Sequence, residues 1–270
     1  MATISTSSHG ETHKMALARK DGAAIVSLSG IAKTFENGTR ALDRFDLDLR
    51  RGEFLSLLGP SGCGKSTLLR ILAGLEKPSQ GSVTWDGEGD GRGEHDLGFV
   101  FQEPTLLPWA SVRDNIRFPL RVKKISSGTA KERIEQVLEL VGLDRFADSY
   151  PHELSGGMKM RVSIARALVT EPKVLLMDEP FAALDEITRF KLNADLLRVW
   201  QASQLTVVFV THSVFESVFL SERIAVMRAS PGRISDEILI DPARIRDERF
   251  RTSSDYAALC RQVSDALHAA

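Results

Sequence analysis

The eight residues 59–66, Gly-Pro-Ser-Gly-Cys-Gly-Lys-Ser, constrain this chain more than any other segment, because they match the pattern G-x-x-x-x-G-K-[ST] in full. Phe54–Leu58 before them has the dense apolar character of a strand buried on both faces. Residues 66–73 after them have helical character, and Gly74 closes that helix. Glycines allow a tight turn that points successive backbone N–H groups at phosphate oxygens, and the helix start adds its positive dipole end. The segment therefore predicts a phosphate-binding loop between a buried strand and a helix.

Each residue of this loop is expected to contact a bound nucleotide. The predicted nucleotide-binding residues are Gly59, Pro60, Ser61, Gly62, Cys63, Gly64, Lys65, Ser66 and Thr67. The Lys65 ammonium supplies a point charge for the β- and γ-phosphates, the Ser66 hydroxyl is a predicted Mg²⁺ ligand, and Thr67 is expected at the α-phosphate. ATP and Mg²⁺ are therefore the predicted cofactors. Alkylation of Cys63 should block ATP binding, unless this cysteine is only an unreactive small residue that fills the turn.

Apolar strands and amphipathic helices alternate along the rest of the chain. Strands are predicted at 25–31, 45–49, 98–101, 174–177, 207–210, 224–227 and 234–240, and helices at 129–141, 156–169 and 186–201. The first two strands alternate apolar with polar residues around a turn at 37–38, which favours an antiparallel pair. The later strands are continuously apolar, as in a parallel sheet covered on both faces. Helix 186–201 places Ile187, Phe190, Ala194 and Leu197 on one face.

Two further segments carry donors and acids of the kind that a triphosphate site needs. Residues 154–158, LSGGM, lie at the start of helix 156–169, where backbone N–H groups and the helix dipole favour an anion. Residues 174–179, VLLMDE, end a buried strand in Asp178 and Glu179. One acid can hold the Mg²⁺ shell through water, while the other takes a proton from the attacking water or orients it. Alone, the first segment could be a simple capped helix start and the second an acidic strand end facing solvent.

Taken in order, these motifs resemble the ABC nucleotide-binding family over nearly the whole chain from about residue 24. The resemblance implies an α/β fold: a P-loop NTPase (RecA-like) core with a mixed sheet, an N-terminal antiparallel β subdomain, and an inserted α-helical subdomain at about 104–160. It also implies that Ser155, Gly156 and Gly157 bind the γ-phosphate held by the opposite subunit. The segment departs from the common form of this signature by ending in Met158 instead of Gln.

By the same resemblance, four side chains act at the γ-phosphate. Asp178 is a Mg²⁺ ligand and Glu179 the catalytic carboxylate. Gln102 follows strand 98–101 as the Q-loop residue does, which contacts Mg²⁺ or the water. His212 follows an apolar strand as the switch histidine does, which binds the γ-phosphate and helps to position the water. A lone glutamine or histidine in such a place is more often a surface or structural residue, so both assignments depend on the order of the motifs.

Two shorter matches complete the predicted site. Residues 183–185, ALD, resemble the D-loop, which crosses the dimer interface, and Asp185 is the predicted site residue; an alanine stands where the family usually has serine. Phe35 lies where the family stacks an aromatic ring, more often Tyr, on the adenine. An aromatic residue beside a strand can also belong to the core.

The resemblance also implies partners. Because one chain's signature covers the other chain's γ-phosphate, the active form is a pair of ATPase subunits, expected to be a homodimer. Transmembrane permease subunits receive the work, and residues 105–109, TLLPW, either contact a permease helix or form a local packing loop. Residues 101–109, 154–167 and 230–234 resemble those of nitrate, sulfonate and taurine importers, which makes a solute-binding protein an indirect partner.

Composition limits the alternatives. A formal net charge of −1 over 270 residues gives no electrostatic reason to bind nucleic acid, and two cysteines make neither a disulfide framework nor a zinc site. No run approaches the roughly 20 apolar residues of a spanning helix, so the chain is expected on the cytoplasmic face of the inner membrane, held by the permease. Residues 1–22 are a predicted disordered leader, 23–240 the ATPase domain, and 241–270 a short C-terminal extension. A non-transport ABC ATPase and a P-loop kinase of small metabolites are the rival functions.

Overall fold

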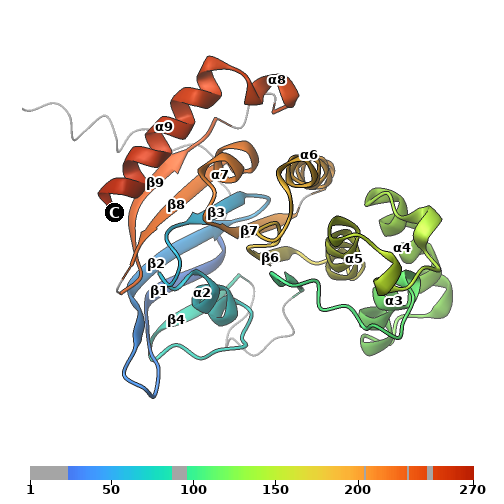
Figure 1. The fold of residues 1–270 in the computed structure, drawn as a ribbon. Coiled ribbons are helices and arrows are strands. Elements are labelled where there is room, and N and C mark those ends of the chain that lie inside the picture. The colour runs from blue at the N-terminus through green and yellow to red at the C-terminus, as the bar shows by residue number, and fades with distance from the viewer. Residues whose placement is uncertain (1–23, 87–95, 204, 230, 242–245) are drawn as a thin grey trace, which may run out of the picture.

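The computed structural model describes residues 24–86, 96–203, 205–229, 231–241 and 246–270. Its centre is a six-stranded sheet in the order β5-β6-β7-β3-β8-β9 (Figure 1). The strands are β3 (Phe54–Leu58), β5 (Leu97–Val100), β6 (Val174–Asp178), β7 (Thr206–Thr211), β8 (Arg223–Arg228) and β9 (Arg233–Leu239). Neighbours pair in parallel except β8 and β9, which are antiparallel. The mixed sheet of the sequence prediction is therefore confirmed.

A three-stranded antiparallel sheet in the order β2-β1-β4 lies beside the first one. Its strands are β1 (Ala24–Thr34), β2 (Arg40–Arg50) and β4 (Gln80–Trp85). Helix α2 (Lys65–Leu72) packs with both sheets, since Phe45 of β2, Leu57 of β3 and Leu68 of α2 are fully buried in one apolar cluster. The predicted antiparallel pair is thus confirmed, and both strands are longer than the alternation indicated.

Three helices form a helical body toward the right of Figure 1, with an apolar cluster of their own, and one of them also packs on the core of the six-stranded sheet through Met160, Ile164 and Leu168. They are α3 (Val112–Val122), α4 (Ser127–Leu140) and α5 (Gly156–Leu168). The last two correspond to the predicted helices at 129–141 and 156–169. The sequence does not single out α3, because Pro119 inside it lacks the amide donor of a helix interior. The start of α3 is fixed by Ser111, whose hydroxyl accepts a hydrogen bond from the Asp114 amide at 3.2 Å.

Helix α6 (Glu186–Ala202) exists as predicted, and of the face assigned to it from the sequence Leu197 is buried in the core, whereas Ile187 and Phe190 are not. Ile187 is 83% exposed and Phe190 is 40% exposed. The residues that enter the core of the six-stranded sheet are Leu192, Leu196, Leu197 and Val199. The reason is tertiary: the C-terminal extension lies over part of the predicted face, with the Arg251 guanidinium 4.5 Å from the centre of the Phe190 ring.

The other helices are α7 (Val214–Leu220), which precedes β8, and α8 (Glu248–Arg251) and α9 (Ser254–Ala269), which follow β9. Helix α9 buries Tyr256, Cys260 and Val263 in the cluster of the six-stranded sheet, so the extension packs on the main core. The predicted leader 1–22 lies outside the described residues. Within the part of the chain that the structure describes, we find no helix with the length and apolar character needed to cross a membrane.

Candidate active site

The phosphate-binding loop connects the end of β3 to the start of α2. Its glycines are required by contacts as well as by conformation. Gly64 has φ 94°, and a methyl group there would lie 2.7 Å from the Ala41 carbonyl oxygen. At Gly59 a methyl group would lie 2.6 Å from the Met227 carbonyl oxygen. The loop is therefore packed directly against backbone of β8 and of the antiparallel sheet.

The register of the sheet brings the functional segments to one edge. Leu58 at the end of β3 pairs with Thr211 at the end of β7, and Asp178 at the end of β6 pairs with Val210. Because these three strands run in parallel, the residues that follow them emerge together. The loop at 59–66, Glu179 and His212 therefore share the carboxyl edge of the sheet, where open α/β sheets bind ligands.

Lys65 lies at the centre of this group. Its side chain is 4% exposed, and its ammonium donates hydrogen bonds to the carbonyl oxygens of Gly59 at 2.8 Å and Pro60 at 2.9 Å. The same nitrogen lies 3.7 Å from Oε1 of Glu179. A phosphate group bound in the loop would compete with these three acceptors for one cation.

Ser66 and Asp178 form an oxygen pair beside the lysine. The Ser66 hydroxyl donates a hydrogen bond to Oδ1 of Asp178 at 2.8 Å. Burial raises the pKa of Asp178, and the hydrogen bond from Ser66 opposes that shift. A hydroxyl and a carboxylate held this close are donors of the type that Mg²⁺ prefers, so the residues fit that cation.

Glu179 has a backbone conformation that is rare for a residue with a side chain. Its φ is 44°, and its amide donates to the Val210 carbonyl oxygen at 3.0 Å. Its Oε2 lies 3.2 Å from Nδ1 of His212. The carboxylate is 18% exposed and the imidazole 52% exposed, so the histidine faces solvent on one side. Such strained positions concentrate at functional sites.

The remaining predicted site residues lie outside this group. Ser155 caps α5 by accepting a hydrogen bond from the Met158 amide at 3.3 Å, and Gly156 is exposed in the first turn. Helix α5 belongs to the helical body at the right of Figure 1, whereas α2 lies at the left. Asp185 caps α6 through the Thr188 amide at 2.9 Å, and this hydrogen bond lowers the pKa of its carboxyl.

Gln102 and Phe35, the last two predicted site residues, both lie at the ends of strands. Gln102 follows β5, at the edge of the sheet next to β6, and is exposed. Phe35 is 38% exposed at the end of the β1 strand, with the Lys33 ammonium 5.2 Å from its ring centre. Phe35 is therefore not a core residue, and its ring is available for stacking.

The structure contradicts the expectation that Cys63 reacts readily with an alkylating reagent. The side chain is fully buried and belongs to the apolar cluster around α2. Burial raises the pKa of the thiol, and the nearby Lys65 only partly opposes this. Only the backbone of Cys63 can face a ligand, because its side chain points into the core and fills the turn.

Sequence reasoning missed Thr211, Arg189 and Glu216, which share a small crevice with Glu179 and His212. The available signal was a glutamate four residues after His212, at the start of the short helix α7, which the sequence did not reveal as a helix.

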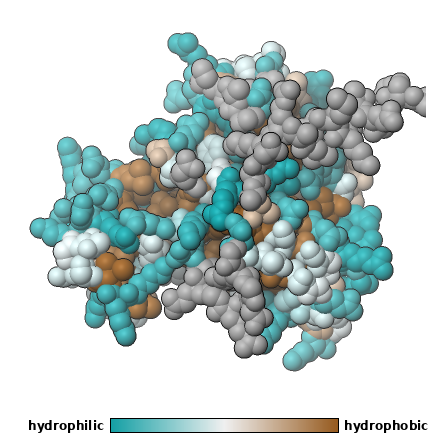
Figure 2. Space-filling model, turned by 180° about the vertical axis from the view of Figure 1, so that it is seen from behind, coloured by the Kyte–Doolittle hydropathy of each residue, from teal (hydrophilic) through white to brown (hydrophobic). Residues whose placement is uncertain are grey.

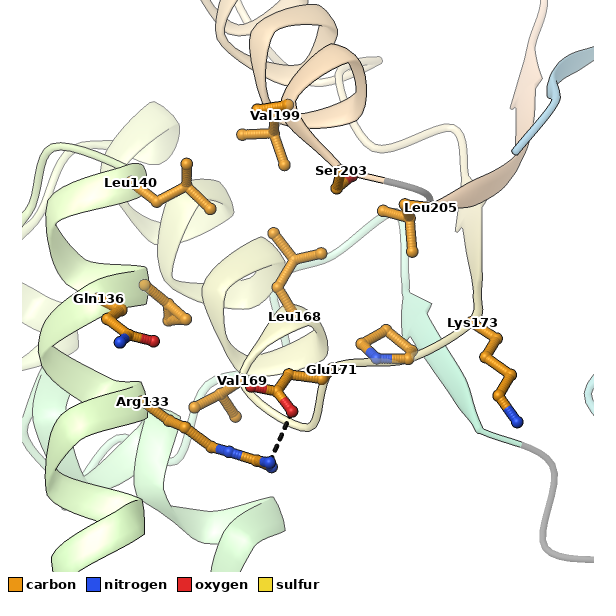
Figure 3. Close-up of a pocket in the computed structure, with 13 residues that line it drawn as sticks. Arg133, Gln136, Leu140, Leu168, Val169, Glu171, Lys173, Val199, Ser203 and Leu205 are labelled. Atoms are coloured by element: carbon orange, nitrogen blue, oxygen red, sulfur yellow. Dashed lines mark ion pairs between the residues drawn. The ribbon is translucent and has the colours of Figure 1, made fainter. Parts of the chain in front are cut away.

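A larger cavity of about 510 Å³ lies at the opposite edge of the sheet (Figure 3). It is lined mainly by apolar side chains of α4, α5 and α6, and by Lys173 and Leu205, which precede β6 and β7. The Arg133 guanidinium and the Glu171 carboxylate pair across it at 2.5 Å. The cavity is therefore separate from the site at the carboxyl ends of the same strands.

Comparison with known proteins identifies many relatives. A family model described as ABC transporter matches residues 42–182. An uncharacterised ABC transporter ATP-binding protein of Methanocaldococcus jannaschii is 47% identical over 246 residues, 90% of this chain and 91% of that protein. The aliphatic sulfonates import ATP-binding protein SsuB of Bacillus cereus is 45% identical over 241 residues, 88% of this chain and 94% of that protein.

Solved structures that match this chain are also ATP-binding cassettes or parts of ABC transporters. A dimeric ATP-binding cassette in a post-hydrolysis state, bound to ADP and Pi, matches with a TM-score of 0.71 and 34% identity over 80% of this chain and 99% of that chain. The cbiO1 protein of Clostridium perfringens, part of an ABC transporter complex, matches with a TM-score of 0.73 and 30% identity over 79% of this chain and 88% of that chain.

Proposed function

Since the chain belongs to the ABC transporter family and is one of its ATP-hydrolysing, ATP-binding subunits, we propose that two copies close around ATP to drive import of a small organic anion. Aliphatic sulfonates are the preferred solute class, because a relative of 45% identity is named for their import. Nitrate and taurine are the other solutes that the signature run 154–167 suggests.

In the proposed reaction, water attacks the γ-phosphorus in line with the leaving ADP oxygen. Lys65 neutralises charge on the β- and γ-phosphates, and Thr67 contacts the α-phosphate. Glu179 accepts a proton from the water or orients it, and His212 contacts the γ-phosphate. The 3.2 Å contact between Glu179 and His212 supports this division, because it puts base and phosphate ligand side by side.

Mg²⁺ would be held by Ser66, by Asp178 through water, and by Gln102. When bound, it would neutralise charge that develops on the phosphate oxygens. The oxygen pair of Ser66 and Asp178 at 2.8 Å supports this assignment. Phe35 would stack on the adenine, and the remaining loop residues would bind phosphate through backbone N–H groups.

A second copy would complete each site. Ser155 and Gly156 are exposed at the start of a helix in the helical body, and Gly157, the next residue of that helix, is buried. Their backbone N–H groups at a helix start suit a γ-phosphate presented by another chain. Asp185 would lie at the interface between the copies. A dimeric cassette among the solved relatives supports an arrangement of this kind.

The permease is the proposed membrane partner, and the loop after Gln102 is the proposed contact. Arg166 of α5 donates to the carbonyl oxygens of Pro104 at 2.9 Å and Thr105 at 2.8 Å, which fixes the loop. Trp109 at its end is 75% exposed. Apolar patches also occur on the helical body when the molecule is viewed from behind (Figure 2). Through this contact the chain would lie at the cytoplasmic face of the inner membrane, with a solute-binding protein on the far side.

The convergence of Lys65, Asp178, Glu179 and His212 at one sheet edge carries the proposal, and complementation between two inactive variants tests it. Lys65→Ala should disable the loop, and Gly156→Asp should place a negative charge in the signature. A Cβ at Gly156 would meet only Cδ2 of Leu184, at 3.5 Å, and Gly156 is exposed, so the fold should tolerate the substitution. In a head-to-tail dimer, mixing the two inactive variants restores one intact composite site.

We therefore expect each variant alone to lack ATPase activity, and the mixture to regain a substantial part of the wild-type rate. Wild-type specific activity should also fall on dilution. No recovery in the mixture, with mixed dimers verified by differential tagging, would contradict the shared site. Transfer of phosphate to a small-molecule acceptor instead of water would favour the kinase, and capture of DNA or ribosomes without a permease would favour a non-transport ATPase.

A further inference from the structure

Glu216 holds the residues on both sides of His212. Its carboxylate is 8% exposed and accepts a hydrogen bond from the Thr211 hydroxyl at 2.5 Å. The Ser213 amide donates to that same hydroxyl at 3.0 Å, and the Glu216 amide donates to the Ser213 hydroxyl at 3.3 Å. The backbone that carries His212 is therefore fixed, before and after the histidine, to one glutamate of α7.

Arg189 continues this chain of contacts toward Asp185. Its Nε lies 3.7 Å from Oε1 of Glu216, and its Nη2 donates to the Leu184 carbonyl oxygen at 2.9 Å. The Arg189 amide also donates to the Asp185 carbonyl oxygen at 2.9 Å. One guanidinium thus hydrogen-bonds the segment that precedes α6 and lies at ion-pair distance, without a hydrogen bond, from the glutamate of the helix after His212.

Stability alone gives little reason for this pair. Arg189 is 27% exposed and Glu216 8% exposed, and burying opposite charges often stabilises a fold no more than apolar residues of the same volume would. Burial also raises the pKa of Glu216, ahead of the opposing effects of Thr211 and Arg189. Both residues line the crevice that Glu179 and His212 share, which points to a role in the site.

We propose that Glu216 and Arg189 are positioning residues that couple the Asp185 segment to His212. This inference rests on the proposed function, in which Asp185 lies at the subunit interface and His212 contacts the γ-phosphate. Docking of the second subunit against residues 183–185 then sets the position of Leu184, of the Arg189 guanidinium and of the Glu216 carboxylate. Through Thr211 and Ser213, that position determines where the imidazole stands.

Arg189→Met and Glu216→Gln test the coupling with little change of volume. We expect kcat to fall at least ten-fold in each, while the Kd for ATP, measured with a fluorescent ATP analogue, stays within two-fold. The Hill coefficient of ATPase activity against ATP concentration should fall toward 1. The double variant should be no slower than the slower single variant, because both changes break one connection.

Two matched variants complete the design. Arg189→Lys keeps the charge that faces Glu216 but loses the planar guanidinium that also hydrogen-bonds the Leu184 carbonyl oxygen, so its kcat should be intermediate. Arg198→Met makes the same substitution on the exposed side of α6, where the arginine is 75% exposed, and should keep wild-type kcat and Hill coefficient.

If the wild type is active and Arg189→Met keeps the wild-type kcat and Hill coefficient, the inference is overturned and the proposed function is left intact. A loss that appears only as weaker ATP binding or as a lower unfolding midpoint would also overturn it, because that is the signature of a purely structural role. A wild type without ATPase activity would contradict the proposed function, and this inference with it.

Discussion

Replacing Glu179 by glutamine removes a carboxylate that stands 3.7 Å from the Lys65 ammonium and 3.2 Å from the His212 ring. We expect two opposite effects. Hydrolysis should slow by roughly 100- to 10,000-fold, the usual contribution of a positioned general base. ATP binding should become tighter, because the lysine loses a competing anion and the γ-phosphate loses a repelling one.

The size of the binding effect follows from the geometry. Coulomb's law for unit charges at 3.7 Å, with an effective dielectric constant of about 20, gives an attraction of about 4.5 kcal/mol. Most of this is not recovered on substitution, since Lys65 keeps its hydrogen bonds to Gly59 and Pro60 and water screens the 18% exposed carboxylate. A net gain of about 1 kcal/mol corresponds to roughly five-fold tighter ATP binding.

Calorimetric titration with ATP and Mg²⁺ measures the affinity, and size-exclusion chromatography with ATP present measures dimerisation. Glu139→Gln, an exposed residue of α4, is the control and should match the wild type in both. If Glu179→Gln bound ATP no more tightly than this control, the electrostatic reasoning would be refuted. If it remained monomeric with ATP, the shared-site mechanism would be refuted instead.

Three other perturbations test the packing and the buried groups. Gly157→Ala puts a methyl carbon 2.6 Å from Cγ2 of Thr188, so overpacking should destabilise the fold by about 1–3 kcal/mol, measured by denaturant titration. Burial raises the thiol pKa of both Cys63 and Cys260, so the native chain should react slowly with a thiol reagent and release both thiols only when unfolded; a fast native reaction would contradict this. Burial raises the pKa of Glu216 above its ordinary 4.5. The contribution of protonated Glu216 to the free energy of unfolding is therefore complete below pH 4.5 and is lost as the pH rises through the pKa of the folded state. The free energy of unfolding of the wild type, relative to Glu216→Gln, should therefore decline above pH 4.5 and then level off, and a pH-independent difference would refute this.

Local patterns predicted the parts of the site that depend on neighbours in sequence. The loop at 59–66 needs a strand before it and a helix after it, and both are readable from apolar runs of the right length. The acids at 178–179 and His212 were found because each follows a buried strand, and parallel strands end together.

What the sequence could not supply depends on tertiary packing. The buried face of α6 is set by the cluster of the six-stranded sheet, which takes Leu192 and Leu196 from this helix, whereas Phe190 is left to a contact with Arg251 of α8, some fifty residues later in the chain. The direction of the Cys63 side chain is set by the cluster around α2. The link from Glu216 to Arg189 joins two helices, and no periodic pattern within either one indicates it.

The register of the parallel strands β3, β6 and β7 explains why the segments that follow them lie together in one site. With Leu58 level with Thr211, and Asp178 level with Val210, the segments that leave the sheet after β6 and β7 start side by side. Each then enters a helix, and the first turns of α6 and α7 bring Arg189 and Glu216 within 3.7 Å. A slip of one residue between β6 and β7 would turn Asp178 to the opposite face of the sheet and separate it from Ser66. Because β6 and β7 are buried on both faces, with Leu176 and Val208 fully enclosed, such a slip would place side chains of different size in a close-packed core and is disfavoured. The same apolar packing that stabilises the sheet therefore keeps Lys65, Glu179 and His212 in one position, and leaves the helices behind them as the route that we propose for the action of a second subunit on the site.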